Sequence, residues 1–222
     1  QLTHILNSAN QDTTNSPQLK LIDNSDWLTK LNYIDFLRDI GQHFSVNRML
    51  SAESAKQRLE RNQGLSFIEF NYHLLQSYDF LVLNERYNCA LQVGGDDQWF
   101  NILGGVDLIR RVAHKEAHAL TVPLLTTADG KKMGKTEKGA VWIDPVQCSP
   151  FDYFQYWLNV HDDDVIRFLK LYTFLTMENI EDLATLEGAD IRKAKRVLAL
   201  EATAIVHGRA SADAADAAAR SL

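Results

Sequence analysis

The chain has 222 residues, of which 45% are hydrophobic and 23% are charged, a composition typical of a water-soluble protein with one large domain or one and a half smaller ones. No apolar run approaches the ~20 residues that a membrane helix needs, so no membrane contact is expected. The formal net charge of −6 provides no broad attraction to nucleic acid, and any contact with RNA has to be local or lie outside these residues.

The two cysteines, Cys89 and Cys148, form no metal-binding pattern. The histidines have no metal-ligand spacing either, so the sequence predicts no metal site. A reduced, cytoplasmic protein is the expectation for such a cysteine content.

Polar residues fill the first part of the chain, and residues 1–18 are expected to form a loose connection. Residues 20–23, Lys-Leu-Ile-Asp, predict a short strand. Apolar residues then recur at helical spacing over residues 28–40, which predicts a helix that ends at a glycine. Residues 52–62 are charged and predict an exposed helix.

A capping box, Ser66 with Glu69, predicts the start of the next helix. On this helix Tyr72, Gln76 and Asp79 follow the spacing i, i+4, i+7 and therefore share one face. A phenol, an amide and a carboxylate in one stripe are what a zwitterionic, phenolic ligand requires. Taken alone, without the other motifs, the same three side chains favour a solvated polar face.

A strand is predicted over residues 87–95, where apolar side chains alternate with others before the chain reaches Gly94-Gly95. Asp96-Asp97 can then cap a helix that continues to Arg111. A strand, a glycine turn and a helix form the βα unit of a nucleotide-binding sheet, whose ligand lies at the carboxyl end of the strand. A Gly-Gly turn alone is weak evidence for such a site.

Three lysines within five residues follow the next predicted strand, residues 121–125, in the segment Lys131-Lys132-Met133-Gly134-Lys135-Thr136. We call residues 131–136 the lysine segment. Ammonium groups act as point charges on a polyphosphate, and Gly130 and Gly134 allow the backbone to approach it closely. The Walker A spacing is absent. A solvated basic turn would have the same composition, and residues 140–143 after it are strand-like.

From Ser149-Pro150 onward, a helix cap followed by proline, the pattern is helical only. The change from alternating strands and helices to helices alone predicts a domain boundary, with one domain over residues 1–147 and another over residues 148–222. Helices are expected at residues 151–160, 162–169, 177–184, 190–206 and 210–222.

Three of these motifs, in this order, resemble the signatures of one enzyme family. The lysine segment resembles the KMSKS signature of class I aminoacyl-tRNA synthetases in the variant Lys-Met-Gly-Lys-Thr. Residues 94–99, Gly-Gly-Asp-Asp-Gln-Trp, resemble the Gly-Gly-Ser-Asp-Gln-Trp segment of tyrosyl-tRNA synthetases. Tyr72, Gln76 and Asp79 match the Tyr-x3-Gln-x2-Asp helix of the same enzymes.

The resemblance covers residues 20–208 and implies an α/β fold of the bacterial type of tyrosyl-tRNA synthetase. Residues 1–147 would form the second half of a Rossmann-like catalytic domain that includes the lysine segment, and residues 148–222 the start of a helical domain on the anticodon side. The His-x-Gly-His motif of the family does not occur in these residues. We therefore expect part of a longer protein, inactive on its own.

The function that the resemblance implies is that of a tyrosine–tRNA ligase, which activates tyrosine with ATP and transfers it to tRNA(Tyr). Tyrosine, ATP with Mg²⁺ and tRNA(Tyr) would be its partners, and the enzyme would be a homodimer. Tryptophanyl-tRNA synthetase is an alternative, against which the Tyr72, Gln76, Asp79 face argues. A non-catalytic RNA-binding or interaction module derived from a synthetase is another, against which the intact lysine segment argues.

The resemblance also assigns the site residues. Asp79 would accept a hydrogen bond from the substrate phenol, Tyr72 and Gln76 would hold its ammonium group, and the lysines would stabilise the leaving pyrophosphate. The residues expected to bind tyrosine are Tyr72, Gln76, Asp79, Gln92 and Gln98. Those expected to bind ATP or the adenylate are Asn24, Gly94, Gly95, Asp97, Lys132, Met133 and Lys135, and those expected to act in catalysis are Lys132, Lys135 and Thr136.

Two positions depart from the family pattern. Asp96 stands where serine is usual, and Phe100 where glycine is usual. Both flank the turn that would bind the ribose. A second carboxylate beside Asp97 adds repulsion toward phosphate, and Phe100 adds bulk in the first turn of the predicted helix.

Overall fold

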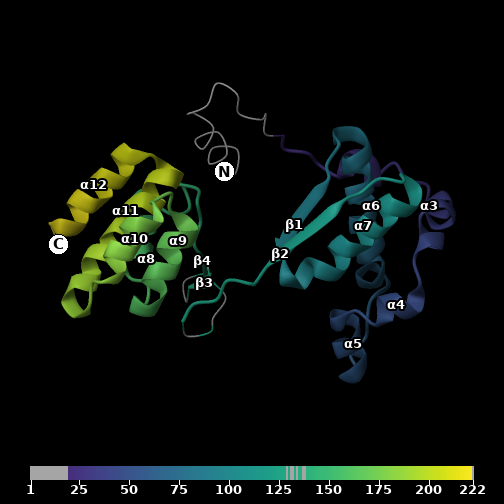
Figure 1. Cartoon of the computed structure of the whole chain (residues 1–222), viewed down its shortest axis with the longest axis horizontal. Coiled ribbons are helices and arrows are strands. Elements are labelled where there is room, and N and C mark those ends of the chain that lie inside the picture. The colour runs from purple at the N-terminus through teal and green to yellow at the C-terminus, as the bar shows by residue number, and fades with distance from the viewer. Residues whose placement is uncertain (1–19, 129, 131–132, 134, 137–138, 222) are drawn as a thin grey trace. The chain divides into compact units, whose positions relative to one another are not determined.

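The structure is a computed structural model that describes residues 20–221, apart from residues 129, 131–132, 134 and 137–138. Two compact units emerge from its contacts, one from Ile22 to Leu124 and one that includes Leu125–Leu222. Figure 1 shows their elements. The domain boundary between residues 147 and 148 stays a prediction.

Short helices open the first unit: α2 (Ser25–Leu28), α3 (Tyr33–Asp39), the 3-10 turn η1 (Gly41–His43), α4 (Val46–Leu50) and α5 (Glu53–Glu60). The strand predicted at residues 20–23 is wrong. There the chain turns into α2 instead, because the Asp23 carboxylate accepts a hydrogen bond from the Ser25 N–H at 2.8 Å.

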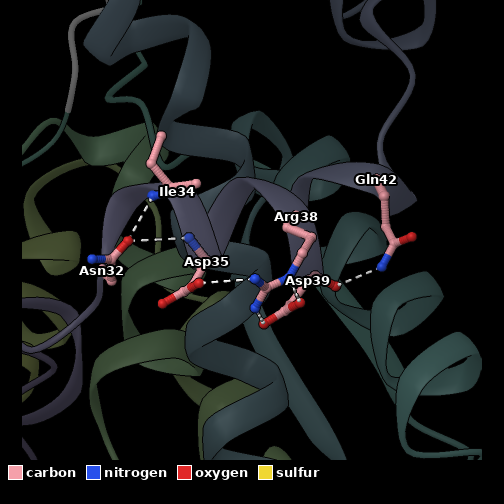
Figure 2. A network of polar contacts seen from close by, with 6 residues as sticks. All are labelled: Asn32, Ile34, Asp35, Arg38, Asp39 and Gln42. Carbon is pink, nitrogen blue, oxygen red and sulfur yellow. Dashed lines mark hydrogen bonds and ion pairs between the residues drawn. The ribbon is translucent and has the colours of Figure 1, made fainter.

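The single helix predicted over residues 28–40 is also wrong, because the chain breaks at Asn32. The Asn32 side-chain oxygen accepts hydrogen bonds from the N–H groups of Ile34 (3.0 Å) and Asp35 (3.2 Å), which starts a new helix. Figure 2 shows this cap together with Arg38, whose guanidinium contacts Asp35 at 3.0 Å and Asp39 at 2.8 Å.

Helix α6 (Phe67–Tyr87) begins with the predicted capping box at Ser66. It runs through Tyr87, where a strand was predicted, and ends at Asn88 in the left-handed conformation (φ 52°). The strand that follows, β1 (Leu91–Gly95), is correspondingly shorter than expected.

Strand β1 pairs in parallel with β2 (His118–Val122), with Leu91 opposite His118 and Gly95 opposite Val122. This register places β2 three residues before the strand predicted at residues 121–125. Between the two strands lie the 3-10 turn η2 (Asp96–Gln98) and α7 (Trp99–Val112). The predicted βα unit of strand, turn and helix is therefore present, and its parallel pairing with β2 extends it to a βαβ unit.

Helix α7 packs closely against α6 because two glycines face it. A Cβ atom at Gly105 would come within 2.8 Å of the Phe80 ring, and one at Gly104 within 2.4 Å of His73. The core around this contact is apolar and includes Phe36, Ile40, Met49, Leu74, Phe80, Leu81, Leu108, Ile109 and Ala117.

The described part of the second unit is mainly helical. It contains the short antiparallel pair β3 (Lys135–Thr136) and β4 (Gly139–Ala140), followed by α8 (Pro150–Leu158), η3 (Asp162–Asp164), α9 (Val165–Tyr172), α10 (Met177–Ala184), η4 (Gly188–Asp190), α11 (Ile191–His207) and α12 (Arg209–Arg220). The predicted strand over residues 140–143 is therefore limited to its first residue. The change to helices alone after Ser149 is confirmed.

Apolar side chains from α8, α9 and α11 form the core of this unit, among them Phe154, Trp157, Phe168, Leu169 and Leu198. Asp216 on α12 is 6% exposed and accepts hydrogen bonds from Arg196 on α11 at 2.5 and 2.7 Å, which joins these two helices. Over the stretch that the structure describes, no helix combines the length and apolarity needed to cross a membrane.

Candidate functional site

The carboxylate of Asp79 is held by two donors, one from the N-cap residue of α2 and one from the helix itself. The Asn24 side-chain amide donates to one oxygen at 2.9 Å, and the indole N–H of Trp27 donates to the other at 2.7 Å. Trp27 is buried, and the Arg86 guanidinium lies 5.6 Å from the centre of its ring. A carboxylate oxygen has two lone pairs, so both oxygens of Asp79 can still accept a hydrogen bond from a ligand.

Tyr72, Gln76 and Asp79 lie on one face of α6, because the helix is continuous from Phe67 to Tyr87. Their side chains remain accessible: the side chain of Tyr72 is 55% exposed, and Gln76 and Asp79 are half-buried. His73, Ser77 and Phe80 form the buried face of the same helix. The face predicted to bind a ligand is therefore separate from the face that builds the core.

Gln92 on β1 carries a buried side-chain oxygen that has no hydrogen-bond partner among the described residues. An unsatisfied buried acceptor costs about 1–3 kcal/mol, so such an atom is expected to have a partner in the working protein. A ligand N–H or O–H group, or water, would supply it. Gln92 therefore has spare acceptor capacity, as Asp79 does; the buried side-chain oxygen of Asn84 in the same unit is also without a partner among the described residues.

The carboxyl end of β1 forms a tight turn at its two glycines. A Cβ atom at Gly95 would come within 2.6 Å of an Asp97 carboxylate oxygen, and one at Gly94 within 3.0 Å of Ile102 and 3.1 Å of Gln98. Asp97 is exposed and accepts a hydrogen bond from the Gln98 amide at 3.3 Å. The turn thus presents a carboxylate and an amide next to a backbone that a ligand can approach closely.

A polar chain links this turn to the interior. The Asn101 amide donates to Gln98 at 3.4 Å, and the Asn101 oxygen hydrogen-bonds the Nδ1 atom of His73 at 3.3 Å. Burial lowers the pKa of His73, against the opposing effect of the Asn101 hydrogen bond, and the Arg48 charge lowers it further. The imidazole is therefore neutral at neutral pH.

The lysine segment belongs to the other unit. Lys131 and Lys132 lie outside the described residues, whereas the backbone of Lys135 and Thr136 forms β3. Met133 is half-buried: its N–H donates to the Leu125 carbonyl at 3.1 Å, and its sulfur accepts a hydrogen bond from the Tyr172 hydroxyl at 3.2 Å.

The whole chain, residues 1–222, matches the model of the family described as tRNA synthetases class I (W and Y). The chain belongs to this family. It is 60% identical over 200 residues to a tyrosine–tRNA ligase of Rhodopseudomonas palustris, covering 90% of this chain and 48% of that protein. It is 62% identical over 192 residues to a tyrosine–tRNA ligase of Acetivibrio thermocellus, covering 86% of this chain and 47% of that protein.

Among solved structures, a C-terminally truncated mitochondrial tyrosyl-tRNA synthetase of Aspergillus nidulans superposes with a TM-score of 0.83 at 30% identity. The superposition covers 99% of this chain and 65% of that one. This agreement confirms the predicted fold, a partial class I synthetase catalytic domain followed by helices. The chain spans about half the length of the curated relatives that it matches.

The structure places both residues that depart from the tyrosyl-tRNA synthetase pattern, Asp96 and Phe100. The Phe100 ring packs on the His73 ring, with centroids 4.2 Å apart and planes tilted by 30°. Its bulk is therefore accommodated between α7 and α6. Asp96 is exposed, and nothing in the structure explains its replacement of serine.

Sequence reasoning missed Trp27. Its indole hydrogen bond joins residues 52 positions apart, so no local pattern announces it. The spacing of Asn24 and Trp27, one helical turn apart, is the sequence feature that indicates that both side chains can contact the same group.

Proposed function

We propose that the protein to which these residues belong is a tyrosine–tRNA ligase, which forms tyrosyl-adenylate from tyrosine and ATP and transfers the tyrosyl group to tRNA(Tyr). One observation carries the proposal: the carboxylate of Asp79 is fixed by Asn24 and Trp27 at the end of the Tyr72, Gln76, Asp79 face. The names of the relatives, tyrosine–tRNA ligases at 60% and 62% identity, support the same conclusion.

Selection of tyrosine follows from a fixed acceptor. Asp79 accepts a hydrogen bond from the phenol through a lone pair that Asn24 and Trp27 leave free, whereas phenylalanine would cover this half-buried carboxylate and offer no donor to that lone pair. Tyr72 and Gln76, on the same face, hold the ammonium group. The buried oxygen of Gln92 offers a further acceptor to the bound amino acid.

We assign binding of the adenylate to the turn after β1, and a further contact with it to Asn24. Asp97 binds the ribose hydroxyls, Gln98 orients the reacting carboxylate, and Gly94 and Gly95 allow the nucleotide to approach the backbone. Asn24 was expected to contact the nucleotide. Its hydrogen bond to Asp79 uses one of its two amide N–H groups, and the other amide hydrogen and the oxygen remain for that role.

Activation is an in-line attack of the tyrosine carboxylate on the α-phosphate of ATP, which breaks the bond to pyrophosphate. The step requires no protein nucleophile and no general base; it requires positioning and stabilisation of the leaving charge. Lys132 and Lys135 supply positive charge, Thr136 a hydroxyl, and Met133 keeps the segment attached to the helical unit. Mg²⁺ would arrive bound to the ATP phosphates, since the described residues offer no group of three His, Cys, Asp or Glu side chains that could hold a metal.

We further propose that the enzyme acts in the cytoplasm as a homodimer. Both cysteines, Cys89 and Cys148, are free thiols, as expected in a reducing compartment. Phe67 and Ile68, on the first turn of α6, are 66% and 72% exposed, and adjacent exposed apolar side chains suit a subunit interface. Light scattering on the complete protein tests the dimer, and a monomer at micromolar concentration would contradict it.

The test of the function is amino-acid-dependent pyrophosphate exchange by the complete protein, measured with tyrosine, tryptophan and phenylalanine. We expect exchange with tyrosine alone. Asp79→Asn keeps the shape of the side chain and removes its charge, and should weaken tyrosine binding in calorimetry by about 1–3 kcal/mol. Exchange with tryptophan, or no exchange at all, would support one of the two alternatives instead.

A further inference from the structure

An ion pair between the buried Asp164 and the exposed Arg167, at the start of α9, binds the backbone that leads into the lysine segment. Asp164 accepts a hydrogen bond from the Ala128 N–H at 2.8 Å. Arg167, one turn further along, donates to the carbonyl oxygen of Thr126 and to the Asp164 carboxylate, the latter at 2.6 Å. The acid and the base thus each hold one backbone group of residues 126–128 and also hold each other.

The position of Asp164 at the start of α9 suggests that it caps this helix, but its hydrogen bonds do not support that role. Asp164 is the N-cap residue of α9, and an aspartate there commonly accepts hydrogen bonds from the first turn of its own helix. Its side chain makes no such bond. The carboxylate is 2% exposed, and its charge is directed to Ala128 and Arg167 instead. A buried carboxylate is costly unless it is paired, so this arrangement depends on both partners.

The last residue of the same helix, Tyr172, contacts Met133 within the lysine segment. The Tyr172 hydroxyl donates to the sulfur of Met133, and the Met133 N–H donates to the Leu125 carbonyl at 3.1 Å. Met133 also packs against the apolar core of the helical unit. Helix α9 therefore contacts the chain both before and within the lysine segment, through its first turn and its last residue.

We infer that Asp164 and Arg167 are positioning residues for amino acid activation: they fix the backbone at residues 126–128, from which Lys132 and Lys135 reach the pyrophosphate. The inference rests on the proposed function of the lysine segment. Neither side chain touches substrate. They act through the lysines, and a charge displaced by about 1 Å from its productive position can lower a rate by about 100-fold.

The experiment compares Asp164→Asn and Arg167→Gln with wild type in the complete protein. Single-turnover formation of the adenylate gives the rate, and equilibrium binding gives the tyrosine dissociation constant. We expect the rate to fall about 10- to 100-fold, with the dissociation constant unchanged within about twofold. Arg167→Lys, which keeps the charge and replaces the planar guanidinium with a compact ammonium group, should recover part of the rate.

Asp216→Asn is the matched control. Asp216 is also buried in the helical unit and paired with an arginine, Arg196, but it joins α11 to α12. Its loss should lower the melting temperature as much as Asp164→Asn does and leave the activation rate within about twofold of wild type. An equal loss of rate in both variants would show general destabilisation and overturn the inference, as would wild-type rates in Asp164→Asn and Arg167→Gln.

A combined variant separates positioning through the two lysines from an independent effect. If Asp164 acts by placing Lys132 and Lys135, adding Asp164→Asn to the Lys132→Ala, Lys135→Ala double variant should slow activation no further. Multiplied losses would overturn the inference. The proposed function is judged on wild type alone: if wild type activates tryptophan rather than tyrosine, that function fails, and the same variants are then measured with tryptophan.

Discussion

Asp79 depends on a tryptophan that lies 52 positions away in the sequence. The indole N–H of Trp27 is one of two donors that fix the carboxylate at 2.7 and 2.9 Å, and Trp27 is also buried, with the Arg86 guanidinium 5.6 Å from the centre of its ring. In the proposed selection of tyrosine, its role is thus to orient the acceptor. A residue of this kind is expected to affect affinity for the amino acid and to have no direct effect on the phosphate chemistry.

Replacing Trp27 with phenylalanine keeps an aromatic ring in place and removes the donor. We expect tyrosine to bind about 1–2 kcal/mol more weakly, because a hydrogen bond to a charged group is lost and Asp79 gains freedom. Calorimetry with tyrosine measures this change. Trp157→Phe, at a buried tryptophan of the helical unit, is the control and should leave tyrosine affinity unchanged. Equal affinities in all three proteins would remove Trp27 from the site.

At the scale of the element, the turn from β1 to α7 leaves no room for a side chain. We expect Gly95→Ala to displace the Asp97 carboxylate, which would lie 2.6 Å from the new Cβ atom, and to press on Leu124 at 3.0 Å. Because Asp97 is assigned to the ribose, affinity for ATP or an adenylate analogue should fall about tenfold or more, whereas tyrosine affinity should change little. Binding measurements with both ligands test this.

Gly64→Ala is the matched control for that substitution, since a Cβ atom at Gly64 would meet nothing within 4 Å. It should leave both affinities unchanged. If Gly95→Ala also bound the nucleotide normally, Asp97 could not have the proposed role. If Gly95→Ala weakened the binding of tyrosine and of the nucleotide equally, the turn would support the structure of the whole unit rather than the nucleotide site.

How far the elements can be predicted depends on whether their cause is local. The capping box at Ser66 and the shared face of α6 were predicted correctly, because both follow from residues within two turns of each other. The break at Asn32 was missed, since apolar spacing continues across it. The position of β2 was missed as well, because it is set by pairing with β1, about 27 positions away in the chain.

The site shows the same division. Tyr72, Gln76 and Asp79 could be grouped from helical periodicity alone, and Gly94 to Gln98 from the sequence of a βα turn. The donors of Asp79, the contact of Phe100 with His73 and the attachment of residues 126–128 to Asp164 could not. Each of these joins separate elements, and the sequence carries no periodic signal for such contacts.

At the scale of the molecule, tyrosine binding and pyrophosphate stabilisation are assigned to different compact units. The tyrosine face, Gln92 and the turn after β1 belong to the unit Ile22–Leu124, and the lysine segment belongs to the unit that includes Leu125–Leu222. Substitutions in the two units should therefore have separable kinetic effects. Those at the tyrosine-binding residues of the first unit should change tyrosine affinity, and those in the lysine segment of the second unit should change the rate of activation.

Lys132→Ala and Lys135→Ala test this separation directly. If these ammonium groups contact the pyrophosphate mainly as it leaves, each contact stabilises the transition state more than the bound substrates. A charge-assisted hydrogen bond of about 1.5–3 kcal/mol corresponds to a loss of about 10- to 100-fold in the single-turnover rate, with tyrosine affinity retained. Lys131 is a neighbouring lysine of the same segment. If it is only solvated, Lys131→Ala should leave the single-turnover rate almost unchanged. A raised tyrosine dissociation constant with an intact rate, in Lys132→Ala and Lys135→Ala, would instead make the lysine segment part of the tyrosine-binding structure and contradict the division of labour between the two units.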